Sequence, residues 1–534
     1  MRILSPRARA LLRALNDTPD VLERLRGAQG NHQDALLRAL ADQQEPALVL
    51  PLFRKVLYAQ DGEARALALA LHPLVSGLGP DDVRALDQAL RQASFYETGY
   101  LDLGAQHLDA YAALSPSVVA LLTCHPSGYL RQPALLRLGG SGSGAAWPFL
   151  LVRLNDWVHP VREAALQAAM AALPAVPLKL LVRHFPLVEA LRQYRRADHA
   201  PFVEQVMARL RQPDALAWLA ANLGTLVGRS RRMAFRLVVE RSEELARPLV
   251  ESALDDPDPV VKGLAAGRVE QLFSGEELLR MLARMERSRS MGVRREAYVT
   301  YARRFPGLGE AKVREALLDS SRSIRDYAQR RLSGTVDVAG LYREALRESS
   351  PRTGALTGMG ETGHASDARL LAPFLAHPRA SVRREAVTAM GRLDGEGCAE
   401  ALRELLGDPV PSVSRAAAHA LAQGPRRITS GWLRRCLFQP GLPPHAVGLA
   451  FQLTEALPSS EALLLLIEAT DLPEAAHREL AHHHLRRWMY VHTRRFSSGS
   501  TPIPLGTLRQ AVRTARNLEP RMALELDHLL RGLE

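Results

Sequence analysis

The sequence predicts an all-α protein: an α-α superhelix in which short helical hairpins stack one on another. Two observations support this prediction. A unit of 31 or 32 residues recurs along most of the 534-residue chain, and only 5% of the residues are aromatic although 47% are hydrophobic. A period of about 20 to 50 residues is typical of stacked helical units. Dividing the length by the period predicts roughly 15–16 hairpin repeats.

Four aligned columns define the repeat. Its anchor is a basic or polar residue, which the clear units place at Arg131, Arg162, Lys262, Arg294, Arg325, Arg383 and Ser414. One position earlier stands an aliphatic residue: Leu130, Val161, Val261, Val293, Ile324, Val382 and Val413. Three positions later stands alanine: Ala134, Ala165, Ala265, Ala297, Ala328, Ala386 and Ala417. Six positions before the anchor stands a residue able to cap a helix or close a turn: His125, Asp156, Asp256, Ser288, Asp319, His377 and Asp408.

The segment 156–173 shows why each unit should form helices. Asp156 can accept backbone N–H groups at the turn that enters the helix. Pro160 suits the first helical turn, where a missing N–H costs nothing. Apolar residues then follow at helical spacing and predict one buried face. The alanine column leaves room for close helix approach, and stacked neighbours bury the stripe that one hairpin leaves exposed.

The segment 371–423 carries the motif most clearly and resembles HEAT repeats. It is most similar to the short bacterial HEAT-like repeats also found in phycobilin lyases: a turn residue, Val-Arg, a small-residue helix, then a Gly-rich link. The resemblance implies a HEAT-like solenoid. It implies little about activity, because the family includes scaffolds, transport receptors, lyases and nucleic-acid enzymes.

Repeat regularity predicts three parts. Residues 1–120 are degenerate N-terminal repeats or a cap, 121–423 are the HEAT-like array, with its weakest motif at 174–250, and 424–534 are degenerate repeats with an Arg-rich cap. Weaker units continue the phase at Gln33, Arg65, near Thr98, near Arg196, at Arg232, at Arg352, near Ala446 and at Arg478. Gly- and Pro-rich residues 424–445 predict an irregular connection, and 496–506 predict a loop.

Charge and cysteine content bound the functional classes. The net charge is +12, yet only four of the 69 basic residues are lysine, so part of the arginine excess is compositional. Three widely spaced cysteines offer no disulfide framework and no paired metal motif. The N-terminus lacks the apolar region of a secretory signal, and no run of about 18 apolar residues predicts a transmembrane segment. We expect a cytoplasmic protein.

One surface site is predicted near the C-terminus. Between residues 477 and 516, eight arginines face one acid, with five histidines and three aromatic residues interleaved. Arginine binds phosphate bidentately and aromatic rings stack on bases, so this composition predicts a polyanion site. Its candidate residues are Arg486, Arg487, Trp488, Tyr490, Arg494 and Arg495. The alternative is a solvated cap whose aromatic residues pack inward.

Other candidate motifs have structural interpretations. Eight arginines within 280–304 include the repeat's own anchor, which we expect to pair with neighbouring turns as a structural ladder. GGSGSG at 139–144 lacks the Lys-Ser/Thr of a phosphate loop. The GxGxxG at 358–363 lacks a strand–helix context. We expect both to link helices. The histidines at 477–484 lack metal-ligand spacing, so neither a metal nor another cofactor is predicted.

No nucleophile motif or catalytic constellation is present. The pair Asp156–Trp157 is similar to the acidic and aromatic groove residues of HEAT-like DNA glycosylases, but the repeat already explains Asp156 as a turn residue. The sequence therefore favours a non-enzymatic scaffold that binds a protein partner on its concave surface. The alternatives are a nucleic-acid-binding HEAT-like protein, which would act in DNA repair by analogy, and a phycobilin-lyase-like enzyme.

Overall fold

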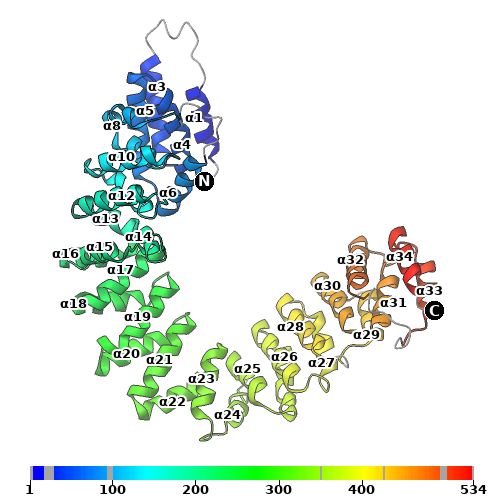
Figure 1. Cartoon of the computed structure of the whole chain (residues 1–534). Helices are drawn as coiled ribbons and strands as arrows, with labels where there is room; N and C mark the ends of the chain where they lie inside the picture. Colours follow the sequence, from blue (N-terminus) through cyan, green and yellow to red (C-terminus); the bar gives the residue numbers. More distant parts are fainter. Residues whose placement is uncertain are drawn as a thin grey trace. The chain divides into compact units, whose positions relative to one another are not determined.

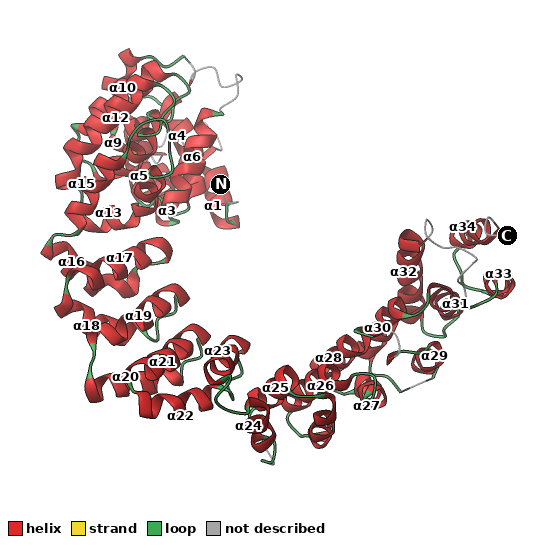
Figure 2. Ribbon diagram, turned by 60° about the horizontal axis from the view of Figure 1, so that its bottom comes forward, coloured by secondary structure: helices red, strands yellow, loops and turns green. Residues whose placement is uncertain are grey.

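The computed structural model describes residues 4–16, 29–92, 100, 102–348, 351–424, 427–439, 441–492 and 502–531. Across these ranges the regular structure is entirely helical (Figure 2), as the all-α prediction requires. No helix in them combines the length and the apolar character needed to cross a bilayer. The chain divides into two compact units, 1–281 and 282–534, each a solenoid of stacked helices. The three-part division by repeat regularity stays a prediction.

Helices follow one another through the described residues of the first unit (Figure 1). They are α1 (Pro6–Asn16), α3 (Gln29–Asp42), α4 (Val49–Tyr58), α5 (Asp61–Ser76), α6 (Pro80–Arg91), α8 (Leu108–Leu114), α9 (Pro116–Leu122), α10 (Gly128–Gly139), α11 (Trp147–Arg153), α12 (His159–Ala172), α13 (Leu178–Arg183), α14 (Phe185–Leu191), α15 (Ala200–Leu210), α16 (Pro213–Asn222), α17 (Gly228–Arg241), α18 (Glu243–Ala253) and α19 (Pro259–Leu272), with α20 (Gly275–Glu286) contributing to both units.

The second unit continues in the same way. Its helices are α21 (Met291–Arg304), α22 (Pro306–Ala316), α23 (Arg322–Leu332), α24 (Val338–Ala345), α25 (Thr353–Thr362), the 3-10 helix η6 (Ala365–Ala376), α26 (Ala380–Asp394), α27 (Ala399–Glu404), α28 (Pro411–Ala422), α29 (Ser430–Phe438), α30 (Pro444–Leu453), α31 (Ser459–Ala469), α32 (Ala475–His492), α33 (Leu505–Thr514) and α34 (Pro520–Arg531).

The aliphatic and alanine columns of the repeat form the core. They lie on the second helix of each hairpin, which we call the motif helix. Every alanine of the column, from Ala134 to Ala417, is fully buried, and the aliphatic column is at most 2% exposed. With no side chain beyond Cβ, these alanines let neighbouring motif helices approach, and α10 packs closely on α12. Each hairpin therefore closes the apolar stripe of its neighbour.

The anchor arginines bind the turn of their own repeat. Nη1 of each donates to the carbonyl six positions earlier, at 2.8–2.9 Å, in Arg131, Arg162, Arg294, Arg325, Arg383 and Arg478. The turn residue also acts on its own backbone. In the α11–α12 turn, Asp156 Oδ1 accepts the amide of Val158 at 3.0 Å, as the sequence predicts.

Three of these arginines, and Arg231 on α17, also reach the turn of the next repeat, 25 residues further along the chain. The pairs are Arg131–Asp156, Arg231–Asp256, Arg294–Asp319 and Arg383–Asp408. In the second unit Arg294 donates two hydrogen bonds to Asp319, at 2.7 and 2.8 Å. The prediction that this arginine forms part of a structural ladder is therefore confirmed. The ladder supplies partners for buried charges that would otherwise be costly.

The ladder departs from the sequence expectation at several anchors, and two of them show how. Arg231, not Arg232, is the ladder residue of α17, because the alanine three positions later is Ala234, which is fully buried. Arg325 has no aspartate 25 positions ahead of it. It binds Glu361 on α25 instead, at 3.0 and 2.7 Å. The partner of a ladder arginine is therefore set by which carboxylate lies near it in space, and not by the position of that carboxylate in the repeat motif.

Two further expectations were wrong. Residues 424–445 were expected to be irregular, but α29 forms among them, because Trp432 and Leu433 bury one helical face. Gly358 and Gly360 were expected in a turn, but they lie inside α25, where larger side chains would collide with Tyr342 and Ala389. The segment 139–144 does link α10 to the next helical turn, and Gly142 there has φ of +62°.

Candidate functional site

A polar cavity of about 290 Å³ lies between α6, α11 and α14 in the first unit. Its wall is rich in charged and aromatic side chains: Arg84, Asp87, Arg91, Arg153, Asp156, Trp157, Tyr194 and Arg196. We call this cavity the arginine pocket. Nearly all residues of α11 are buried, and the helix ends at Arg153. The guanidinium group of Arg153 therefore lies in the interior, with the side chain only 1% exposed.

Asp156 is the centre of the buried charges behind the pocket. It accepts two hydrogen bonds from Arg131, at 3.1 and 2.8 Å, and one from Arg153 Nη1 at 3.0 Å. Arg91 Nη2 also donates to it. Three guanidinium groups therefore converge on one carboxylate in a place where the Asp156 and Arg131 side chains are fully shielded from solvent.

A second carboxylate, Asp87, completes the cluster. It accepts from Arg91 Nε at 3.1 Å and pairs with Arg153. Burial raises the pKa of Asp87, while Arg91 and a hydrogen bond from Cys124 oppose that rise. Burial holds the pKa of the Cys124 thiol well above its usual value, so the thiol contributes no charge. Three arginines thus face two carboxylates.

The repeat pattern predicts only the ladder part of this cluster. Arg131 and Asp156 stand in the repeat columns, but Asp87, Arg91 and Arg153 do not. A signal was present nonetheless. Arg153 interrupts the apolar run WPFLLVRL, and a charged residue on a buried helix requires partners. Which partners it meets depends on α6, more than 60 residues earlier, and no local pattern reveals that.

An apolar groove of about 470 Å³ adjoins the arginine pocket between α12 and α15. Leu166 and Met170 on α12 form one wall and are 43% and 40% exposed, while Phe202 on α15 is buried within it. We call this the α12–α15 groove. Arg196 lines both the groove and the arginine pocket, so the two share an edge.

The rim of the groove is charged. Its two carboxylates are already engaged: Glu163 lies 3.4 Å from His159 Nδ1, and Asp198 accepts the amide of Ala200 at 2.9 Å. Its two arginines donate only to backbone carbonyls in the hydrogen bonds that the structure shows: Arg162 to Asp156 and Trp157, and Arg196 to Asn155. The rim therefore carries two arginines that bind no carboxylate in these hydrogen bonds, beside two carboxylates, Glu163 and Asp198.

The same geometry recurs nearer the N-terminus. Leu69 on α5 is 68% exposed and borders a groove of about 440 Å³ between α3 and α5. Leu69 lies four positions after Arg65, as Leu166 lies four positions after Arg162. Two motif helices thus present a leucine at the same repeat position beside a groove.

The structure distributes the predicted polyanion residues over different environments of α32. Arg486 pairs with Glu519, and Arg487 Nε lies 3.2 Å from Glu455 Oε1. Both arginines remain more than half exposed. Arg494 and Arg495 lie outside the described residues. The polyanion site stays a prediction.

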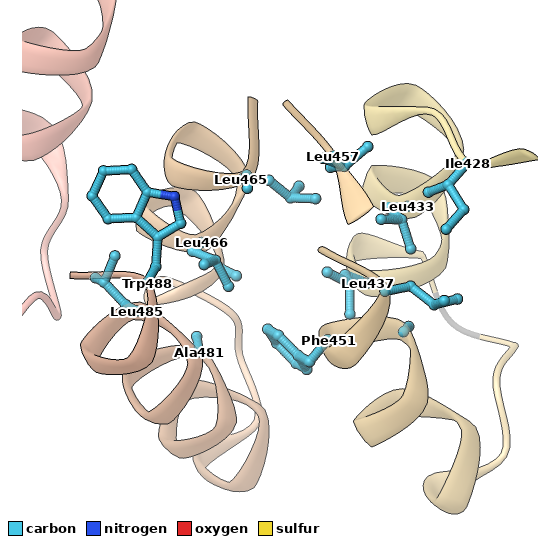
Figure 3. Close-up of a cluster of buried hydrophobic side chains, with 14 of the residues drawn as sticks. Ile428, Leu433, Leu437, Phe451, Leu457, Leu465, Leu466, Ala481, Leu485 and Trp488 are labelled. Atoms are coloured by element: carbon cyan, nitrogen blue, oxygen red, sulfur yellow. The ribbon is translucent and has the colours of Figure 1, made fainter. Parts of the chain in front are cut away.

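The two aromatic candidates point in opposite directions. Trp488 is 5% exposed and donates from Nε1 to the carbonyl of Ser459 at 3.0 Å. Figure 3 shows its indole beside α31, next to Leu466 and Leu485 in the apolar cluster of the second unit. Tyr490 is 91% exposed. Of the two rings, only Tyr490 is available to stack on a ligand.

Comparison with known proteins identifies the repeat. The fold and the ladder define an α-helical repeat protein, and residues 345–425 match the family model for HEAT repeats. These residues include α26 and α28 and the Arg383–Asp408 step of the ladder. The HEAT-like resemblance of the sequence is confirmed.

Solved structures with a similar fold include importin-β proteins. Yeast importin-β (Kap95p) is 14% identical over 98% of this chain, with a TM-score of 0.31. Importin-β crystallised with ammonium sulfate is 12% identical over 98% of this chain, with a TM-score of 0.32. Kap95p from a study of its binding to RanGDP is 10% identical over 85% of this chain, with a TM-score of 0.35. Each alignment covers 66% of the other chain, so this chain spans less than two thirds of their length. No curated protein matches it.

Proposed function

We propose that this chain is a non-enzymatic HEAT-repeat scaffold that binds a protein partner along its motif helices, with the α12–α15 groove as an anchor point. The observation that carries the proposal is the exposure of Leu166 and Met170 beside a groove of about 470 Å³. Exposed apolar side chains at a preformed hollow are typical of interaction sites. The repeat of this geometry at Leu69 supports a binding surface that extends over several hairpins.

The partner's chemistry follows from the rim. A bulky apolar side chain that enters the groove removes Leu166 and Met170 from water, which contributes about 1.5–3 kcal/mol per fully buried side chain. Arg162 and Arg196 offer positive charge beside it. We therefore propose an acidic protein segment that carries a bulky apolar residue. The three cysteines of the scaffold itself, Cys124, Cys398 and Cys436, are free thiols, which supports a location in the reducing cytoplasm.

Selection from a displayed peptide library tests this proposal. The wild-type chain is expected to enrich peptides with a bulky apolar residue flanked by Asp or Glu. Met170→Arg places a charge on the groove wall and should abolish that enrichment. Leu308→Arg is the matched control, because Leu308 on α22 is 42% exposed and lies outside the groove. Enrichment that survives Met170→Arg, or no enrichment on the wild type, contradicts the proposal.

Nucleic acid is the second candidate partner, and Tyr490 is the observation that favours it. Its exposed ring borders a cavity of about 640 Å³ whose wall includes His528 and two arginines, Arg486 and Arg521, which pair with Glu519 and Glu525 in the same wall. A ring for base stacking beside guanidinium groups is the arrangement that single-stranded nucleic acid requires.

An electrophoretic mobility shift at low and moderate salt tests this second candidate, with DNA and RNA probes. Binding that falls steeply with salt and is lost in the Arg486/Arg487/Arg494/Arg495→Ala variant supports it, since phosphate contacts release counterions. The control is Arg280/Arg314→Ala, which removes exposed arginines elsewhere. No shift at low salt, or equal loss in the control, rejects it.

A further inference from the structure

The arginine pocket contains more positive charge than its own carboxylates neutralise. Arg91, Arg131 and Arg153 face Asp87 and Asp156, which leaves one cation in excess at the buried end. A buried charge without a counter-charge is costly because it has lost its hydration. The protein's own fold supplies no third carboxylate among the residues that line this cavity.

A buried donor in the pocket is also unsatisfied. Arg153 Nε has no hydrogen-bond partner, although the side chain is 1% exposed and forms part of the cavity wall. Nearly all buried polar groups in native structures have a partner, so an exception needs an explanation. The excess charge and the unpaired donor belong to the same cluster of side chains.

Two further arginines stand at the mouth of the pocket with weak partners. Arg84 lies 3.7 Å from Asp81, whose carboxylate is almost fully exposed, and its other contact is a 3.5 Å bond to the carbonyl of Pro186. Arg196 donates only to the Asn155 carbonyl in the hydrogen bonds shown. Their remaining N–H groups can turn to a ligand in the cavity without breaking an ion pair of the core.

We propose that the arginine pocket is a binding site for a small oxyanion, a phosphate or carboxylate group. The buried charge of Arg153 attracts the anion from the inner end of the pocket, and Arg84 and Arg196 donate hydrogen bonds to it from the outer end. Guanidinium groups bind both anions with charge-assisted hydrogen bonds. Trp157 and Tyr194 line the same cavity, 64% and 39% exposed, and provide flat apolar surface for the rest of a ligand.

Binding of a free anion does not depend on the proposed protein partner, whereas binding of a partner's acidic side chain rests on the proposed function. The site shares Arg196 with the α12–α15 groove, but Arg84 belongs to the pocket alone. The oxyanion has two sources, a free small molecule or an acidic side chain of a docked protein. Free anions address the first source directly, and an acidic peptide selected on the groove addresses the second.

Isothermal titration of the full chain with inorganic phosphate and with acetate, against chloride at equal ionic strength, tests the site. Saturable binding of one molecule per chain is expected for at least one anion. Arg84→Gln should weaken it about tenfold, the effect of losing one charge-assisted hydrogen bond. Arg280→Gln on α20 is the matched control and should leave the affinity unchanged.

The titrations distinguish a free small molecule from a partner side chain as the source of the oxyanion. Free-anion binding that Arg84→Gln weakens supports a small-molecule site. Binding only of an acidic peptide, weakened by Arg84→Gln, assigns the oxyanion to a partner side chain. Binding that Arg84→Gln and Arg280→Gln alter equally, or no binding of either kind, overturns the inference. Met170→Arg leaves the free-anion result intact, so failure of the groove proposal is seen independently.

Discussion

Single residues decide how closely the helices of this protein approach. Gly358 on α25 faces the buried ring of Tyr342, and a Cβ at this position would overlap that ring. Gly263 on α19 has open space around the same position. The two glycines occupy equivalent helical backbones but have opposite packing requirements.

Gly358→Ala is therefore expected to lower the free energy of unfolding by about 1–3 kcal/mol, the usual effect of overpacking a core. Gly263→Ala, in contrast, should raise it by about 0.5–1 kcal/mol, because alanine costs less backbone entropy in a helix. Urea denaturation measures both. A Gly358→Ala variant as stable as the wild type would show that the ring of Tyr342 moves aside freely.

A buried histidine links stability to pH. His184, at the start of α14, is 1% exposed, and burial, with Arg183 nearby, lowers its pKa to about 3. In the unfolded chain the pKa is about 6.5. Between these values the unfolded chain binds the proton and the folded chain does not, so stability falls as the pH falls below 6.5.

From pH 8 to pH 5 this one histidine is expected to cost about 2 kcal/mol of folding free energy. His184→Gln should remove that part of the loss in urea denaturation at the two pH values. His159→Gln, an exposed histidine on α12, should leave it unchanged. If His184→Gln follows the wild-type pH dependence, His184 titrates normally in the folded protein.

At the scale of the elements, the ladder joins each hairpin to the next. Arg383 on α26 binds Asp408 at 2.7 and 3.0 Å and the carbonyl of His377 at 2.8 Å, with both side chains mostly buried. One residue thus ties its own turn to the following turn. An exposed pair such as Arg314–Glu310 within α22 joins nothing beyond its own helix.

Arg383→Ala is expected to destabilise the second unit by about 3–5 kcal/mol, because it leaves the Asp408 carboxylate buried without its partner. Arg314→Ala should change stability by less than about 1 kcal/mol. A double-mutant cycle with Asp408→Ala isolates the pair, and a coupling no larger than that of Arg314 with Glu310 would refute a structural role for the ladder.

At the scale of the whole molecule, the repeat made the fold predictable. Four columns with a fixed period specify which helical face is buried, and the alanine and aliphatic columns are buried as that pattern requires. The ladder was predictable in outline, because the anchor arginine and turn aspartate recur together.

The candidate site was far less predictable. The arginine pocket depends on Asp87 and Arg91 meeting Arg153 and Asp156, and the contact between α6 and α11 that brings them together leaves no periodic trace. The α12–α15 groove depends on which motif positions stay exposed after stacking. Leu166 reads as one more apolar residue in the sequence, but its 43% exposure distinguishes it. The repeat period does not distinguish Arg231 from its neighbour Arg232, because each pairs with an aspartate of the next turn, Asp256 and Asp258 respectively.

Site-specific photocrosslinking in the native cell, with a photoreactive phenylalanine analogue at Leu166 and, as control, at Leu308, tests the scaffold proposal directly. The scaffold proposal predicts one crosslinked protein at Leu166, joined through an acidic segment with a bulky apolar residue, absent at Leu308 and lost when Met170→Arg is added. Crosslinks of equal yield at both positions, or a Leu166 crosslink that Met170→Arg does not affect, would contradict it.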